Sequence, residues 1–137
     1  MSDGVLNLYT DGACRGNPGQ GGAGAVLVDD KGEVIARVGR SLGHCTNNVA
    51  EYKALILGLE EALKKRCGKL NIFLDSELLV NQMKGSYKVK NETLKGLMNE
   101  VKKLLSYFDS YTVKHIDRSQ NYMADKLANE AIDQATF

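Results

Sequence analysis

The stretch VLNLYTDGACRGNPGQGGAGAVLVDDKGEVIARVGRSL, residues 5–42, decides the fold of this chain. Three segments in it combine alternating apolar and polar positions with strand-forming side chains: residues 5–11, 23–29 and 33–42. The glycine-rich cluster GNPGQGG predicts a turn after the first strand, and Asp30-Lys31-Gly32 predicts a hairpin turn before the third. The chain is therefore expected to open with an antiparallel meander of three strands.

The remaining sequence alternates helices with two further strands. Asn47 or Asn48 can cap a helix that runs to about Arg66 and is ended by Gly68. The later elements are expected at residues 70–74 (strand), 76–85 (helix capped by Ser76), 91–108 (helix capped by Asn91), 111–116 (strand) and 121–134 (helix). Strand–helix–strand connections make their two strands parallel. We therefore predict an α/β fold with a five-stranded mixed sheet, three antiparallel strands plus two parallel ones, flanked by helices.

Composition is that of an ordinary globular chain. With 137 residues and 43% hydrophobic residues, residues 1–137 are expected to form a single domain. The net charge of +1 argues against a strongly basic nucleic-acid-binding protein, although it leaves room for a local basic face. We expect no transmembrane helix, no signal peptide and no obligate protein partner. The three cysteines, Cys14, Cys45 and Cys67, lack metal-site spacing and are expected to be reduced thiols of a cytoplasmic monomer.

Four carboxylates stand in segments that otherwise predict buried strands or apolar helix faces: Asp11, Glu51, Asp75 and Asp125. A buried carboxylate is costly unless a positive charge neutralises it. Four of them converging would need a cation, and oxygen ligands in that number suit Mg²⁺ or Mn²⁺. The sequence therefore predicts a metal-dependent site for phosphoryl transfer.

Each carboxylate also has a simpler interpretation. Asp75 ends the strand at residues 70–74, where it could merely cap the next helix, although Ser76 is available for that role. Asp11 could belong only to an Asp-Gly turn, and Asp125 could be a solvated acid of the last helix. Glu51 shares its helix stripe with Leu55, Gly58 and Ala62, which favours an inward position over a surface one.

Four segments resemble, in order, the conserved blocks of the type 1 ribonuclease H family. They are YTDGACRGNPGQGGAGAVL, TNNVAEYKALILGLE, LDSELLVNQMKG and VKHIDRSQNYMADKLANEA, and the resemblance covers roughly residues 5–134. The resemblance implies a ribonuclease H-like fold and an endonuclease that cuts the RNA strand of an RNA/DNA hybrid. It further implies catalysis by two divalent ions, Mg²⁺ or Mn²⁺, that leaves 5′-phosphate and 3′-hydroxyl ends.

The resemblance also implies roles for individual side chains. The four acids of the family match Asp11, Glu51, Asp75 and Asp125, with Asp11 and Asp75 as the ligands shared by both ions. Two ions held about 3.5–4 Å apart would activate water and neutralise the leaving oxygen. His115 matches the family's loop histidine and is expected to shuttle a proton or help product leave. Its alternative interpretation is a strand-end histidine without chemistry.

Asn17, Thr46, Asn47 and Asn48 resemble the polar residues that contact the hybrid in this family, and by the same resemblance Cys14 lies in the substrate loop. Arg118 is a further candidate for binding the scissile phosphate. Asn47 and Asn48 have the alternative role of helix caps, Cys14 could be an inert thiol, and Arg118 could be merely solvated. The family's basic, tryptophan-bearing insertion is absent here, because residues 85–91 read GSYKVKN and the chain has no Trp. Lys84, Lys88 and Lys90, with Tyr87, are expected to form a reduced substitute for this basic protrusion.

Two other functions remain compatible with the sequence. One is a catalytically silent module that binds hybrids or duplexes on the same fold, because a fold alone does not determine function. A complete set of four acids argues against it, since a binder gains nothing from buried negative charge beside a polyanion. The other is a related nuclease that also cuts double-stranded RNA.

Overall fold

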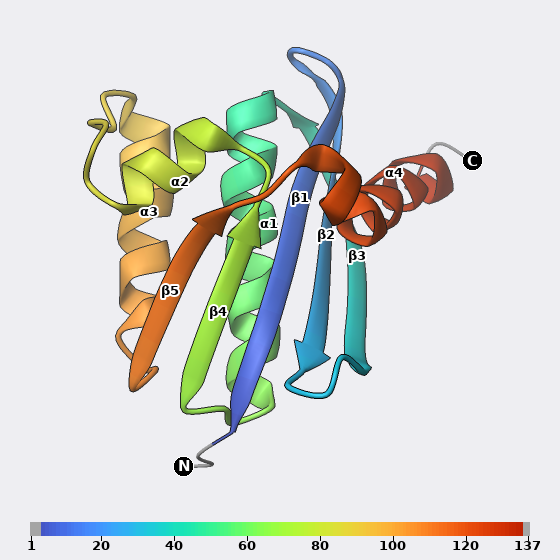
Figure 1. Cartoon of the computed structure of the whole chain (residues 1–137). Coiled ribbons are helices and arrows are strands. Elements are labelled where there is room, and N and C mark those ends of the chain that lie inside the picture. The colour runs from blue at the N-terminus through green and yellow to red at the C-terminus, as the bar shows by residue number, and fades with distance from the viewer. Residues whose placement is uncertain (1–3, 136–137) are drawn as a thin grey trace.

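The computed structural model describes residues 4–135, which form one mixed sheet flanked by helices (Figure 1). The strands are β1 (Val5–Gly16), β2 (Gly19–Asp29), β3 (Val34–Cys45), β4 (Lys69–Leu74) and β5 (Ser110–His115). The helices are α1 (Asn47–Lys64), α2 (Glu77–Met83), α3 (Glu92–Leu105) and α4 (Tyr122–Ala135), and a 3₁₀ turn, Arg118–Asn121, precedes α4. Within residues 4–135, no helix combines the length and the apolarity needed to cross a membrane.

The sheet has the strand order β3-β2-β1-β4-β5. The pairs β1–β2 and β2–β3 are antiparallel, whereas β1–β4 and β4–β5 are parallel. This arrangement confirms the predicted mixed sheet of three antiparallel strands plus two parallel ones. In the parallel pair β1–β4, Thr10 stands opposite Leu74, so that Asp11 and Asp75 follow side by side.

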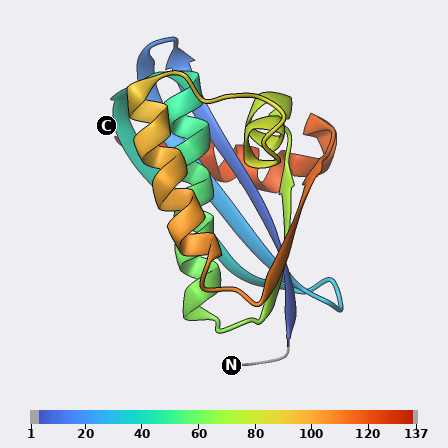
Figure 2. The ribbon, with the colours of Figure 1, turned by 90° about the vertical axis from the view of Figure 1, so that its left-hand side faces the viewer.

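Helices cover both faces of the sheet (Figures 1 and 2). Helices α1 and α3 pack together on one face, and α4 crosses part of the other over β1, β2 and β3. The main core lies under α1, where Leu8, Leu55, Leu59 and Ile72 are completely buried. Burial of apolar surface on this scale is the main stabilising term, and it holds the strand ends that carry the site in place.

The first hairpin is longer than the sequence predicts. Strands β1 and β2 stay paired up to Gly16 and Gly19, so most of the expected GNPGQGG turn is strand. The glycines on either side of this cluster serve close packing, because a Cβ at Gly12 would lie 2.2 Å from the Ala50 carbonyl carbon of α1. On the opposite face, a Cβ at Gly24 would lie 2.1 Å from the Ala124 carbonyl oxygen of α4. Missing side chains thus let helices approach the sheet from both sides.

Two predicted helix caps are confirmed and one is wrong. Ser76 accepts a hydrogen bond from the Leu79 N–H at 3.2 Å, and Asn91 accepts one from the Leu94 N–H at 3.1 Å. Helix α1 is capped by Thr46, whose hydroxyl accepts from the Val49 N–H at 3.3 Å, rather than by Asn47 or Asn48. Thr46 is the last extended residue, which is the conformation that a cap requires.

The end of α1 also differs from the prediction. The helix ends at Lys64 rather than near Arg66, and Arg66 itself takes a φ of 56°. The turn is therefore completed before Gly68, which instead donates its N–H to the Gly4 carbonyl at 3.2 Å at the start of β4.

Candidate active site

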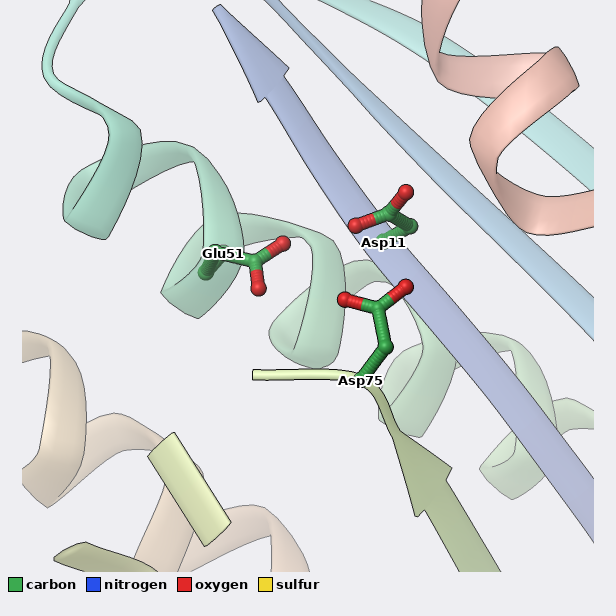
Figure 3. Close-up of side chains that lie close together, drawn as sticks. All are labelled: Asp11, Glu51 and Asp75. Atoms are coloured by element: carbon green, nitrogen blue, oxygen red, sulfur yellow. The ribbon is translucent and has the colours of Figure 1, made fainter. Parts of the chain in front are cut away.

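Three carboxylates converge where the parallel pairing between β1 and β4 ends (Figure 3). Asp11 lies on β1, Glu51 on α1 and Asp75 directly after β4, and an oxygen atom from each lies within 4.8 Å of the others. Asp11 is only 7% exposed, while Glu51 and Asp75 are half-buried. The three side chains point toward one another, and such a group can hold a metal ion.

The backbone of β1 fixes Glu51. Because Gly12 has no side chain, β1 touches the first turns of α1 at Ala50 and Glu51. The Gly12 N–H donates a hydrogen bond of 2.5 Å to Glu51 Oε1. The predicted inward position of Glu51 is therefore confirmed, and a backbone donor holds its carboxylate beside Asp11.

Crowding and burial disfavour negative charge at this place. Burial raises the pKa of Asp11 well above its usual range, and the charges of Glu51 and Asp75 raise it further. Burial likewise raises the pKa of Glu51, although the Gly12 N–H and the Arg118 charge act in the opposite direction. The cluster therefore favours bound protons or a bound cation over bare carboxylates.

Asp125 approaches the cluster from the other face of the sheet. It lies in the first turn of α4, is half-buried, and is close enough to Asp11 for its side chain to raise the pKa of Asp11. Asn129, four residues later, donates to Asp125 Oδ1 at 3.2 Å and to its carbonyl oxygen at 3.0 Å. The sequence did not identify Asn129, although its spacing of one helical turn from Asp125 could have indicated it.

The four acids line one open cleft of about 530 Å³. Its remaining lining residues are Gly12, Ala13, Cys14, Asn47, Asn48, Ser76, Arg118 and Asn129. Of the predicted hybrid-contacting residues, Cys14, Asn47, Asn48 and Arg118 thus reach the cleft. Asn17 and Thr46 line a neighbouring hollow of about 340 Å³ together with Asn48, Asn91 and Thr93.

His115 ends β5 beside the cleft, outside its lining. The side chain is exposed, and its Nε2 lies 3.2 Å from the Asp75 carbonyl oxygen. This contact links the histidine to the backbone of a cluster residue. His115 is therefore a solvent-facing group at the rim of the cleft.

The three predicted lysines lie apart from the cleft. Lys84 follows α2, while Lys88 and Lys90 lie in the exposed loop before α3. Lys88 lines a hollow of about 360 Å³ with Tyr87, Lys95 and Lys102. Lys95 and Lys102 were not identified from the sequence, although their spacing of seven residues puts them on one face of α3.

Asn121 is a further residue that the sequence did not identify. It closes the 3₁₀ turn and is 1% exposed. Its Nδ2 donates to the Thr10 carbonyl oxygen and to Asp75 Oδ2, both at 2.9 Å. Among the described residues, its Oδ1 is the one buried side-chain oxygen or nitrogen without a hydrogen-bond partner. Nothing in its immediate sequence context distinguishes a buried asparagine from a solvated one.

Comparisons with known proteins agree with this geometry. A family model described as "Reverse transcriptase-like" matches residues 9–131. Ribonuclease H of Thermoanaerobacter sp. (strain X514) is 37% identical over 147 residues, which cover 96% of this chain and 92% of that protein. The chain belongs to the ribonuclease H family.

Solved ribonuclease H structures are similar over nearly the full chain. RNase H1 of Halobacterium salinarum superposes with a TM-score of 0.93 at 39% identity, covering 96% of this chain and 99% of that one. LC11-RNase H1, solved in complex with an RNA/DNA hybrid, gives a TM-score of 0.92 at 40% identity, with coverage of 96% and 99%. The chain spans only 35% of a bifunctional protein of Mycobacterium tuberculosis, to which it is 42% identical over 129 residues.

Proposed function

We propose that this protein is a metal-dependent endoribonuclease that hydrolyses the RNA strand of RNA/DNA hybrids. Residues 1–137 would act as one catalytic domain and leave 5′-phosphate and 3′-hydroxyl ends. The observation that carries the proposal is the convergence of Asp11, Glu51 and Asp75 within 4.8 Å in a cleft that Asp125 also lines. The hybrid bound by the related LC11-RNase H1 supports the choice of substrate.

The carboxylates fit divalent ions. All four side chains offer hard oxygen ligands, and burial makes the uncompensated charge of Asp11 and Glu51 unfavourable. Asp11 and Asp75 would be shared between two ions, with Glu51 completing one set of ligands and Asp125 the other. Bound Mg²⁺ or Mn²⁺ would supply an activated water and neutralise the leaving oxygen.

The chain's own residues bind and orient the substrate. Arg118, whose charge already acts on Glu51, lies in the cleft where it can attract the scissile phosphate. Asn17, Thr46, Asn47 and Asn48 lie around the start of α1, and their amides and hydroxyl can contact phosphates and 2′-hydroxyls. His115 would carry a proton at the rim through its exposed imidazole.

The exposed lysines form a surface that binds the nucleic-acid backbone weakly. Lys84, Lys88 and Lys90 lie on and after the end of α2, and Lys95 and Lys102 continue the positive charge along α3. Each phosphate contact adds affinity that salt weakens. We infer that these residues bind the hybrid outside the cleft without touching the reacting atoms.

One copy of the chain supplies all four acids, which supports a monomeric enzyme. Cys14, Cys45 and Cys67 are free thiols, as suits a reducing, cytoplasmic setting. A module that only binds duplexes would gain nothing from buried carboxylates beside a polyanion. The acids therefore favour catalysis over binding alone.

The test is cleavage of matched duplexes. RNA/DNA, RNA/RNA and DNA/DNA duplexes of one sequence would be incubated with the protein and Mg²⁺, Mn²⁺ or a chelator. The proposal expects cleavage of the RNA strand of the hybrid, with either ion and not with the chelator. Cleavage of RNA/RNA at the same rate would instead indicate a broader double-strand ribonuclease. Intact hybrid with both ions, under conditions where it binds, would indicate a silent binding module.

A further inference from the structure

The thiols of Cys14 and Cys45 lie close together at the edge of the cleft, although one strand of the sheet separates their own strands. Cys14 lies on β1 and Cys45 ends β3, with β2 between them. The Cys14 thiol donates to the Cys45 carbonyl oxygen at 2.8 Å and to the Gly19 carbonyl oxygen at 3.5 Å. The Cys14 side chain is also close enough to Cys45 to raise the pKa of the Cys45 thiol.

Gly21 makes this contact possible. It stands opposite Cys14 on one side and Gly43 on the other. A Cβ at Gly21 would lie 2.3 Å from Cys45 Sγ, closer than real atoms approach. The Cys45 thiol therefore occupies the space that a side chain on β2 would fill, and from there it reaches Cys14.

The pair connects two segments that border the cleft. Cys14 lines the cleft itself, and Cys45 directly precedes Thr46, the cap of α1. The first residue of α1, Asn47, donates its N–H to Asn17 Oδ1 at 3.1 Å. A covalent bond between the thiols would tie β1 to the start of α1, where these amides lie.

Cys14 and Cys45 are half-buried, so a small reagent can reach them, whereas Cys67 is 3% exposed in the main core. Burial, and then the neighbouring Cys14 thiol, raise the pKa of Cys45. Because the thiolate is the form that attacks a disulfide, a raised pKa makes Cys45 the slower nucleophile of an exchange reaction.

We propose that Cys14 and Cys45 form an oxidisable dithiol whose disulfide restricts access of the hybrid to the cleft. The oxidant is a small disulfide such as oxidised glutathione. An S–S bond forms between the two cysteines, and the S–S bond of the oxidant breaks. The two protons and two electrons lost by the cysteines reduce the oxidant to two thiols. In a reducing compartment such a bond is transient, as expected of a redox sensor. Its effect on the cleft rests on the proposed function, but its formation does not.

Mapping of the crosslink tests the site itself. The full chain would be incubated with oxidised glutathione, its remaining thiols alkylated, and its peptides identified by mass spectrometry. We expect a Cys14–Cys45 crosslink with the loss of two hydrogens, formed equally well in the control Cys67→Ser. Gly21→Ala should slow the reaction, because its methyl group displaces Cys45 Sγ. Alkylation of both cysteines, or separate glutathione adducts on them, would overturn the assignment.

Hybrid cleavage tests the consequence. The crosslinked protein should lose about tenfold or more in kcat/KM, because small displacements of a binding site are costly, and dithiothreitol should restore it. Cys45→Ser in the same oxidant should keep the rate of the reduced parent. Undiminished cleavage by the crosslinked protein would overturn the proposal. If the reduced protein cleaves no hybrid, the proposed function fails, and the mapped crosslink still decides the thiol assignment.

Discussion

Asn121 donates a hydrogen bond of 2.9 Å to Asp75 Oδ2, and its Nδ2 also donates to the Thr10 carbonyl oxygen at 2.9 Å. One buried amide thus joins the middle of β1, the acid after β4 and the turn that leads into α4. Because Thr10 precedes Asp11, the same group holds two of the carboxylates at a set separation. Partners of this kind orient a metal ligand without touching the metal.

Asn121→Ala should weaken divalent-ion binding and hybrid cleavage by about 10–100-fold, the usual effect of losing a residue that orients a ligand. Calorimetric titration with Mn²⁺ would measure the affinity. Asn7→Ala is the matched control, because Asn7 also donates to a main-chain oxygen, that of Asp29, away from the cleft. A loss of thermal stability in both variants with unchanged Mn²⁺ affinity would leave Asn121 with a structural role only.

The stability of the metal-free protein should fall as pH rises. The pKa values of Asp11 and Glu51 are raised in the folded state, so above about pH 4 the folded state retains protons that the unfolded chain has lost. Each unit of pH then costs stability until the folded-state groups also ionise. Urea unfolding at a series of pH values in chelator would show the decline, and Mg²⁺ should reduce it.

Asp11→Asn should flatten this pH dependence and leave the metal-free protein as stable as the parent or more so. The substitution removes a buried ionisable group while keeping the shape of the side chain. It should also abolish detectable hybrid cleavage, because Asp11 is proposed as a shared ligand. A steeper decline with pH in this variant would show that the cluster is not the source of the effect.

His115→Ala should slow turnover by about 10–100-fold without abolishing it, at the low end of general acid–base contributions. The chain offers a matched control in His44→Ala, since His44 is the other histidine and is also exposed. Rates would be measured at saturating hybrid and metal. Equal turnover in both variants would leave His115 as a strand-end residue without chemistry.

Replacing Lys84, Lys88 and Lys90 together by Ala should raise KM more than it lowers kcat, because these side chains bind ground and transition states alike. Binding in Ca²⁺ should be roughly micromolar and should show a shallow salt dependence, equivalent to about 2–4 phosphate contacts. The control replaces Lys64, Lys65 and Lys69, exposed lysines at the end of α1 and the start of β4. A steep dependence of hybrid affinity on salt, or unaltered binding by the variant without Lys84, Lys88 and Lys90, would show that other residues contact the nucleic-acid backbone.

Local patterns were sufficient for the sheet and for most of the acid cluster. Alternation identified the first three strands, and a short apolar run identified β4. Asp11 and Asp75 then lie together because each directly follows Thr10 and Leu74, the last residues paired between β1 and β4. The helix stripe of Glu51 similarly indicated its inward position. These features depend on periodicity along the chain, which a sequence displays directly.

Contacts between distant segments were not predictable. Glycine is a poor strand former, so GNPGQGG suggested a turn, whereas close approach by helices explains the neighbouring Gly12 and Gly24. The burial of Asn121 depends on how the turn before α4 packs against β1. The meeting of Cys14 and Cys45 depends on the missing side chain of Gly21 on the strand between them.

The central claim is that the carboxylate cluster binds divalent ions and thereby cuts RNA in hybrids. Its most direct test is single-turnover cleavage of one labelled RNA/DNA hybrid by the parent and by Asp75→Asn, first in chelator and then after excess Mg²⁺ is added. We predict that only the parent with Mg²⁺ cleaves, and that Asp75→Asn still binds the hybrid in Ca²⁺. Cleavage by the parent in chelator, or near-parental cleavage by Asp75→Asn, would contradict the account.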